Sequence, residues 1–450
     1  MRDVELGVSG AGTAVVGPSG DAGNGLLAMT PPVNAHDHGY GIRPYDFGCL
    51  DDALEPWIAG LRNRPATDPY LEALVAFGRL ALNGCGATLH CHNSLRVDRV
   101  ADEVAAVVRA AKDCGIRLAL SCPLLDIAPW TYGGAEALRP HVPPADWPEF
   151  AQRMPVYAPP SVQIDAVSDL VRTYSGTLTD IQLGPIGPQW CSDAMLEAIA
   201  EASERLDCRI HMHLLESPRQ RHWLDVRFPQ GVVRHLHDIG FLSPRLAVAH
   251  GVQLRPDECD LLAEHGVIVV ANPTANLRLR SGVAPVATFR KTGLRFALGL
   301  DGTGFSDDQD IWQELRLLRL LHGGNGIEAD STAGGLFDAA VTNGGTVIGQ
   351  PVHDDLVLID FGSLTADAMY DDLDEAEILL GRMSGTFVKD LYVAGTRIVA
   401  DRRISGFDFP AARAELAAQA RRLAARNGAE RAFADRLKQA IRQFYGEGWA

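Results

Sequence analysis

The stretch Val33-Asn34-Ala35-His36-Asp37-His38 combines a short apolar strand with two histidines two residues apart. Side chains alternate across a strand, so His36 and His38 point to the same side and can hold one metal ion together. Gly39 and Gly41, directly after the strand, favour an exit loop. Two chance histidines would give the same pair, so its meaning depends on the rest of the chain.

Apolar segments that favour β-strands recur along the chain, each followed by a helical pattern or a long loop. The eight predicted strands lie near 33–38, 87–92, 116–121, 179–184, 209–214, 245–250, 267–272 and 295–301. Amphipathic helices are predicted between several of them, over 97–114, 192–206, 256–265 and 310–321. This alternation indicates an α/β fold, a (β/α)₈ barrel of the TIM type over residues 31–345.

Three other segments flank or interrupt the predicted barrel. Residues 122–165 are rich in Pro and aromatics, which favours a lid-like insertion over the barrel mouth, although a plain surface loop explains them equally well. Strands predicted at 356–360 and 388–399 would join residues 1–30, so 1–30 and 346–405 are predicted to form a small discontinuous β-sandwich domain. Residues 406–450 are predicted as a C-terminal helical tail.

The composition of the 450 residues, 46% hydrophobic and 22% charged, is that of a soluble globular protein. A net charge of -16 argues against nucleic acid or an anionic membrane as a partner. No apolar run is long enough to cross a bilayer, and the N-terminus lacks the pattern of a secretory signal. The eight cysteines form no Cys-x-x-Cys pair, so reduced thiols and a cytoplasmic location are expected.

Four of the eight predicted strands end on residues that can bind a metal or titrate. His36 and His38 end the first, the segment 211–216 ends the fifth, His250 the sixth and Asp301 the eighth. In a barrel of this type the chemistry lies at the carboxyl ends of the strands. Burial of an unpaired Asp301 is costly, so it needs a cation or hydrogen-bond donors nearby. Each residue alone has an ordinary structural explanation, but together they indicate one site.

The ordered set His36-Asp37-His38, His213-Leu214-Leu215-Glu216, His250 and Asp301 resembles the amidohydrolase superfamily. It is most similar to the mononuclear branch of cytosine, guanine and S-adenosylhomocysteine deaminases and triazine hydrolases. The resemblance runs from about Ala28 to Gly406 and includes 271–277, which is similar to a strand-seven signature of that branch. By this resemblance the metal ligands are His36, His38, His213 and Asp301, and the catalytic residues are Glu216, His250 and Asp301. His213 is favoured over His211 because it is nearer the strand end.

Binuclear members of the superfamily carry a carboxylated lysine at the end of strand four. Residues 179–184 contain no lysine, so one divalent metal ion per chain is predicted. Three imidazoles and a carboxylate suit both zinc and iron, and this choice stays open. Four further residues are candidate substrate contacts, namely His92, Gln189, Trp190 and Asn272, although His92 is equally explained as a core histidine.

The reaction that the resemblance implies is hydrolytic deamination of an amino-substituted N-heterocycle of pyrimidine, purine, pterin or triazine type. A divalent ion lowers the pKa of a water molecule, Asp301 and His250 take its proton, and Glu216 protonates the ring nitrogen and then the leaving amine. Displacement of chloride or an alkylamine, or opening of a cyclic amide, uses the same centre, and the motifs do not separate these reactions. A non-catalytic metal-binding relative is the third alternative. A homodimer is expected by analogy alone.

Overall fold

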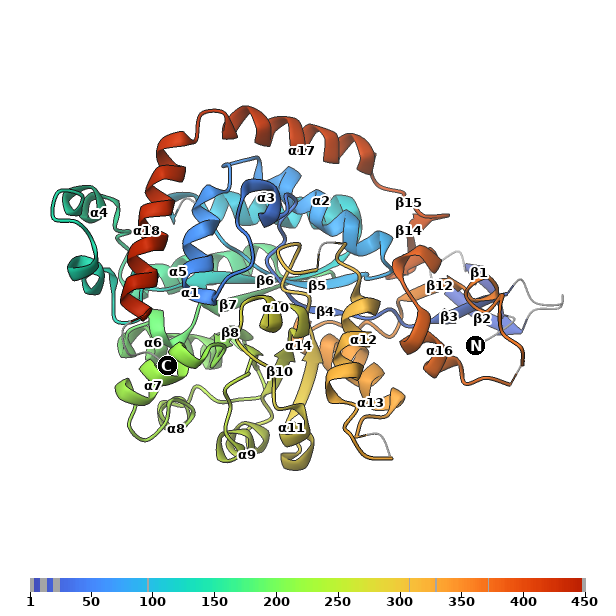
Figure 1. Ribbon diagram of the computed structural model, residues 1–450. Helices are drawn as coiled ribbons and strands as arrows, with labels where there is room; N and C mark the ends of the chain where they lie inside the picture. The colour runs from blue at the N-terminus through green and yellow to red at the C-terminus, as the bar shows by residue number, and fades with distance from the viewer. Residues whose placement is uncertain are drawn as a thin grey trace.

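The computed structural model describes residues 4–8, 14–18, 25–94, 97–306, 308–327, 330–370 and 372–446. Its centre is a parallel eight-stranded sheet with the strands in chain order, which confirms the predicted (β/α)₈ barrel (Figure 1). The strands are β4 (Asn34–Asp37), β5 (Ala87–Cys91), β6 (Arg117–Leu124), β7 (Thr179–Pro185), β8 (Ile210–Leu214), β9 (Leu246–His250), β10 (Ile268–Ala271) and β11 (Arg295–Leu298). Each lies within a few residues of its predicted position.

The first and last barrel strands meet through the chain around Asn34 rather than through a ladder of strand pairing. The side-chain oxygen of Asn34 accepts a hydrogen bond of 2.9 Å from the Leu300 N–H. One residue further on, the Asp301 N–H donates to the His36 carbonyl at 2.9 Å. These contacts bring the ends of β4 and β11, which carry predicted ligands, directly beside each other.

Helices cover the outside of the barrel and begin at the residues that the sequence indicates. Ser192 caps α6 by accepting from the Met195 N–H, and Asp310 caps α12 through the Trp312 N–H. The helices between or after barrel strands are α2 (Pro69–Leu82), α3 (Val100–Cys114), α5 (Pro160–Tyr174), α6 (Asp193–Leu206), α7 (Pro218–Arg227), α8 (Val232–Asp238), α9 (Pro256–Glu264), α10 (Pro273–Arg278), α11 (Val286–Thr292), α12 (Ile311–His322), α13 (Ala333–Asp338) and α14 (Gly344–Ile348).

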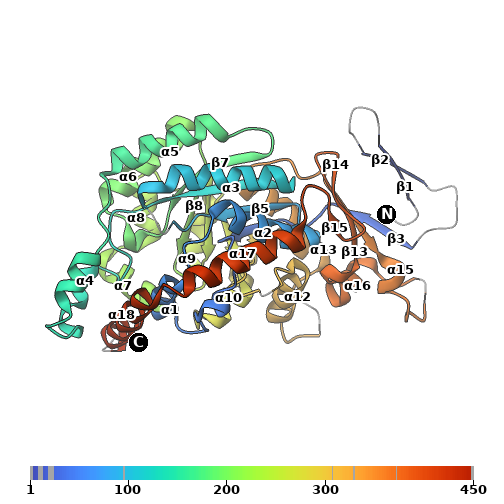
Figure 2. The same ribbon diagram turned by 90° about the horizontal axis from the view of Figure 1, so that it is seen from above.

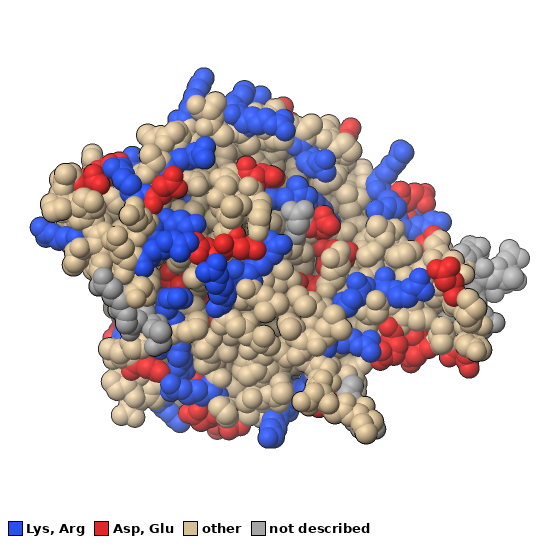
Figure 3. All heavy atoms as spheres, in the orientation of Figure 1, with Lys and Arg blue, Asp and Glu red and all other residues tan. Residues whose placement is uncertain are grey.

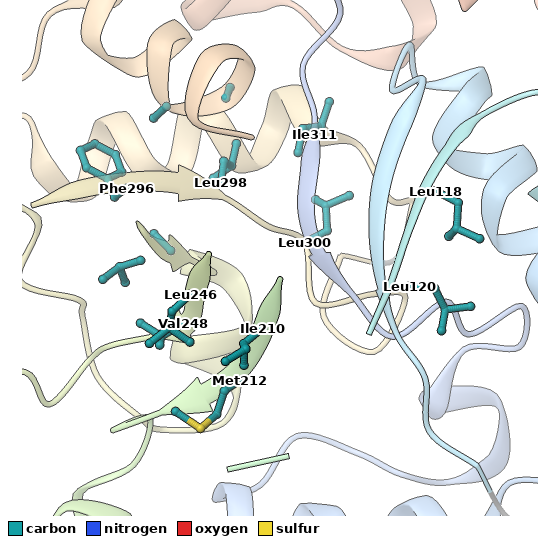
Figure 4. Close-up of a cluster of buried hydrophobic side chains, with 14 of the residues drawn as sticks. Leu118, Leu120, Ile210, Met212, Leu246, Val248, Phe296, Leu298, Leu300 and Ile311 are labelled. Carbon is teal, nitrogen blue, oxygen red and sulfur yellow. The ribbon is translucent and has the colours of Figure 1, made fainter. Parts of the chain in front are cut away.

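Alternation along the barrel strands separates two apolar layers. Large residues face the surrounding helices, as Figure 4 shows for Leu118, Leu120, Ile210, Met212, Leu246, Val248, Phe296 and Leu298. Smaller residues such as Ala35, Ala119, Ala247 and Ala297 fill the inside of the barrel. The outer layer binds helices to strands, and the packed inner layer leaves room for a site only at the strand ends.

A second, five-stranded antiparallel sheet lies at one side of the barrel and combines a strand that precedes the barrel with strands that follow it (Figure 1). Its only N-terminal strand, β3 (Leu26–Met29), pairs with β12 (Leu356–Asp360). The others are β13 (Val388–Val393), β14 (Thr396–Ala400) and β15 (Arg403–Ile404), and a turn at Ala394-Gly395 joins β13 to β14. The strands β1 (Val4–Val8) and β2 (Ala14–Pro18) form a separate two-stranded sheet. The exact domain limits stay a prediction.

The predicted insertion is shorter than 122–165, because β6 continues to Leu124 and α5 already begins at Pro160. Between them lie the short helices η4 (Ala135–His141) and α4 (Trp147–Arg153). The C-terminal tail forms α17 (Phe409–Ala424), which lies along α2, and α18 (Gly428–Gly446), which lies along α1 (Leu54–Gly60) (Figure 2). Phe433 of α18 packs on Trp130 and Phe150, so the tail holds the insertion against the barrel.

The cysteines, the surface charges and the helices also bear on what the composition predicts. All eight cysteines are buried and unpaired. On the face that Figure 3 shows, basic and acidic side chains are intermixed. Within the described ranges, no helix combines the length and apolar character needed to cross a membrane.

Candidate active site

The predicted site residues converge at the carboxyl ends of the barrel strands, at the base of a cavity of about 680 Å³. Five of the predicted metal ligands and acid/base residues line this cavity, namely His38, His213, Glu216, His250 and Asp301. His36 is fully buried directly beneath them. Residues from four separate strands thus meet at one place, as expected for a barrel of this type.

Three imidazoles and one carboxylate form a compact donor cluster. Oδ1 of Asp301 lies 3.3 Å from Nε2 of His36 and 3.2 Å from Nε2 of His38. Nε2 of His213 lies 3.3 Å from Nε2 of His38. Donor atoms bonded to one tetrahedral zinc ion at the usual lengths lie roughly 3.3–3.5 Å apart. The spacing therefore fits a single divalent ion among these four side chains.

The other nitrogen of each imidazole fixes its orientation. Nδ1 of His213 lies 2.8 Å from the Ile186 carbonyl, and Nδ1 of His38 lies 3.1 Å from the Cys91 carbonyl. A carbonyl only accepts, so these Nδ1 atoms carry the protons and each neutral ring directs an Nε2 lone pair into the cluster. Nε2 of His36 is buried without a hydrogen-bond partner among the described residues. A cation satisfies all of these lone pairs at once.

His211, the histidine not favoured as a ligand, lies behind His36. Its Nε2 lies 2.8 Å from Nδ1 of His36. Since His36 directs Nε2 at the cluster, its Nδ1–H donates to His211, which must then carry its own proton on Nδ1. Cys91 Sγ lies 3.4 Å from the same His36 nitrogen. His211 thus orients a ligand from outside the cluster.

Two of the site residues occupy the left-handed backbone region at the ends of their strands. His250 has φ 71° and Asp301 has φ 60°, and glycines with positive φ follow both. This conformation is costly for residues with a side chain, and it turns the side chains inward from the strand ends. Leu215, immediately before Glu216, has φ 52° and turns the chain in the same way.

Glu216 and His250 lie beside the ligand cluster. Nε2 of His250 is 3.7 Å from Oε2 of Glu216 and 3.9 Å from Oδ2 of Asp301. Nδ1 of His250 donates to Oδ1 of Asn276 at 2.9 Å, which leaves Nε2 to face the two carboxylates. Oε1 of Glu216 is buried without a partner among the described residues. A substrate at the cavity base could provide that partner.

The surroundings of Glu216 and Asp301 favour opposite protonation states for the two carboxyl groups. Burial raises the pKa of Glu216 well above its usual range, and the charges of Asp301 and Glu55 add to this. Burial would also raise the pKa of Asp301, but the adjacent His36 and His38 imidazoles outweigh it and hold that pKa well below its usual range. The pKa of His250 is lowered by burial to about 4. Glu216 therefore holds a proton where Asp301 is ionised.

The predicted substrate contacts divide into two groups. His92, Gln189 and Trp190 line the cavity. Asn272 does not contact the cavity. It is fully buried, and its Nδ2 lies 3.3 Å from Nδ1 of His250. Its prediction as a substrate contact is therefore corrected, because it stands behind the His250 ring.

His92 is held by other side chains. Its Nε2 lies 2.8 Å from Glu103 and its Nδ1 lies 3.3 Å from Nε2 of His90. Both ring nitrogens are therefore engaged within the protein.

Several residues around the site were not predicted from the sequence. Asn276 orients His250, and Gln220 bonds both the Glu216 N–H, at 2.5 Å, and Gln189, at 2.7 Å. Asn276 falls inside the signature segment 271–277, which could have indicated it. No sequence pattern marks Gln220, because a glutamine at this helix position looks the same in the sequence whether it is buried or exposed.

The model of the amidohydrolase family matches residues 33–341 of this chain. A 5-methylthioadenosine/S-adenosylhomocysteine deaminase of Nitratidesulfovibrio vulgaris is 30% identical over 234 residues, which cover 50% of this chain and 52% of that protein. A 5'-deoxyadenosine deaminase of Methanothrix thermoacetophila is 29% identical over 308 residues, covering 67% and 64%. The chain thus spans between about half and two thirds of the length of these two relatives.

Solved structures share the fold at lower identity. An adenosine deaminase from Xanthomonas campestris with bound zinc has a TM-score of 0.76 at 21% identity, covering 94% of each chain. An atrazine chlorohydrolase from Arthrobacter aurescens TC1 in complex with zinc has a TM-score of 0.77 at 20% identity, covering 93% of this chain and 95% of that one. The family match extends over most of the barrel and all of the converging residues, and this chain belongs to the amidohydrolase family.

Proposed function

We propose that this protein is a metal-dependent hydrolase that removes an exocyclic amino group from an N-heterocycle. The observation that supports it is the convergence of three imidazoles and two carboxyl groups at the base of one cavity. The curated relatives, which are named as deaminases of adenosine derivatives, support the same reaction.

His36, His38, His213 and Asp301 are the proposed ligands of one divalent ion. Their donor type and spacing suit zinc, which two structural relatives contain, and iron remains the alternative. When bound, the ion would supply a water molecule of lowered pKa.

The protein's own groups would move the protons. The Oδ2 atom of Asp301 and the Nε2 atom of His250 would take a proton from the attacking water. Glu216 would give its proton to the ring nitrogen next to the attacked carbon, which makes that carbon electrophilic. The water oxygen then bonds to the carbon, and the carbon–nitrogen bond breaks as the amine takes the proton held by Asp301 or His250 and leaves as ammonia. The proton that remains on the new hydroxyl returns to Glu216, which leaves a carbonyl on the ring and restores the Glu216 carboxyl group.

A panel of amino-, chloro- and alkylamino-substituted pyrimidines, purines, pterins and triazines would test the proposal. The zinc-loaded protein should replace an amino group by oxygen and release ammonia, read by mass spectrometry. Glu216→Gln should lower the rate by about a hundred- to ten-thousand-fold and keep its metal. Loss of a different leaving group would reject deamination. A homodimer, a cytoplasmic location and the absence of nucleic-acid and membrane partners stay predictions.

A further inference from the structure

The cavity above the ligand cluster is much larger than the reacting ring requires. Its volume is about 680 Å³, whereas a cavity of roughly 150 Å³ holds one benzene ring. Beyond the ligands the walls are mainly apolar, formed by residues such as Trp57, Leu61, Val100, Val162, Leu170 and Phe305. A heterocycle placed at the cluster would leave most of this space to its substituent.

Several polar side chains in the same walls are already engaged within the protein. Each of the following contacts ties up a polar group of the lining: Arg62 with Glu430 at 2.7 Å, Gln163 with the Leu125 carbonyl at 2.9 Å, Asn93 with the Tyr40 hydroxyl at 2.7 Å, and Gln189 with Gln220 at 2.7 Å. Hydroxyl groups of a bound substituent would have to break these contacts or stay unpaired, and both are costly.

Carboxylates that could hold a sugar diol are scarce in this cavity. Among the lining residues that the structure describes, Asp98 is the one carboxylate outside the site cluster, and it is exposed to solvent. A ribose placed deep against the apolar walls would therefore lose water without gaining matching acceptors.

The mouth of the cavity carries apolar side chains that the fold leaves uncovered. Val156 is 85% exposed and Val162 is 54% exposed, and both line the cavity. An apolar group on a bound ligand would remove these surfaces from water. The rim and the deeper walls thus select the same kind of substituent.

We propose that the substrate is an amino-substituted heterocycle that carries a bulky alkyl or aryl substituent in place of a sugar, and that this cavity binds the substituent. The inference rests on the proposed function for the position of the ring. It differs from the curated relatives, which are named for adenosine derivatives.

Matched substrates would test the inference in the zinc-loaded protein. Adenines and diaminotriazines would each carry methyl, butyl, benzyl or dihydroxypropyl, with adenosine added to the first series. We expect kcat/KM to rise at least tenfold from methyl to butyl, since each buried methylene contributes roughly a factor of three to four. The dihydroxypropyl compounds and adenosine should fall below butyl and benzyl. Calorimetric binding to Glu216→Gln should give the same order without turnover.

Two surface variants make the test specific to the cavity. Val162→Asp places a charge in the apolar rim and should lower the preference for butyl over methyl at least fivefold. Val226→Asp is the matched control, because Val226 is 70% exposed on α7 and is not part of the cavity lining. It should leave the preference unchanged.

The outcomes separate the two proposals. If ammonia is released but adenosine or a dihydroxypropyl compound is preferred over the butyl and benzyl compounds, the inference is overturned and the deaminase proposal stands. If the butyl and benzyl compounds bind tightly but no compound releases ammonia, the inference stands and the deaminase proposal is overturned. Binding by neither series, or equal effects of both valine variants, would overturn the inference.

Discussion

His211 is the residue whose contribution follows most directly from geometry. Its Nε2 accepts from His36 at 2.8 Å and so holds the ring of a proposed ligand. Partners of this kind are typically worth 10- to 100-fold in metal affinity. We expect His211→Phe to bind zinc roughly that much more weakly in a chelator competition, with the fold intact by circular dichroism. Unchanged affinity would show that His36 needs no such partner.

Glu314 gives a prediction about pH. It is buried, and its pKa is raised by burial to about 7, although Thr274 donates to both of its oxygens through its N–H and its hydroxyl. The folded pKa lies above the unfolded value of 4.5, so the folded state binds the proton more tightly. This contribution to stability is present below about pH 4.5 and is lost as the pH rises through 7.

Glu314→Gln removes this titration. The glutamine oxygen can accept from the Thr274 N–H, and its Nε2 can donate to the Thr274 hydroxyl, which then accepts. The native protein should therefore lose on the order of 3 kcal/mol relative to the variant between pH 4.5 and pH 8. Urea unfolding of both proteins at the two pH values measures it. A difference between them that does not change with pH would contradict the assignment.

At the scale of elements, the C-terminal helix α18 ties down the wall of the cavity. The Tyr445 hydroxyl accepts a hydrogen bond of 2.8 Å from the buried N–H of Tyr132 in the insertion. The Tyr132 hydroxyl in turn lies 2.9 Å from Glu55 on α1. Tyr445→Phe leaves that N–H without its acceptor, which should cost about 1–3 kcal/mol in unfolding free energy.

Hydrogen exchange would locate the effect of Tyr445→Phe. Amides of the insertion, between Leu125 and Pro159, should exchange faster, and those of the barrel strands should not change. Tyr370→Phe is the control, since Tyr370 is exposed. An equal effect of both variants would show that α18 does not hold the insertion through this contact.

The barrel strands and the principal site residues are predictable from the sequence because both depend on short local segments. Each barrel strand is a short apolar run with polar residues at its ends, so the local sequence is enough to place β4 to β11. His36, His38, His213 and Asp301 lie at strand ends, where barrel topology must bring them together. The insertion is shorter than the predicted range 122–165 at its C-terminal end, because proline occupies the first turn of α5 and also favours a loop.

Contacts between distant segments were not predictable in this way. The Tyr445 contact with Tyr132 and the Asn34 contact with Leu300 join residues that are hundreds of positions apart. No local pattern marks such pairs, because each depends on how complete elements pack. The position of the Asn272 side chain was not predictable for the same reason. Its segment is near the site, but its side chain lies behind His250.

At the scale of the whole molecule, one buried ion pair connects the barrel to the five-stranded sheet. Arg117 at the start of β6 makes two hydrogen bonds with Asp355, of 2.7 and 2.8 Å. Removing one partner leaves a buried charge, so Arg117→Met should cost about 3–5 kcal/mol. Pairing it with Asp355→Leu should recover much of that loss. If the double variant has the same unfolding free energy as Arg117→Met alone, the two residues are not coupled in this way.

The proposed reaction depends on one divalent ion held by His36, His38, His213 and Asp301. Elemental analysis after dialysis against zinc tests this claim most directly. We predict about one ion per chain in the native protein and in Glu216→Gln, and close to none when His213→Ala and Asp301→Ala are combined. Two ions per chain, or one ion retained in that double variant, would contradict the claim.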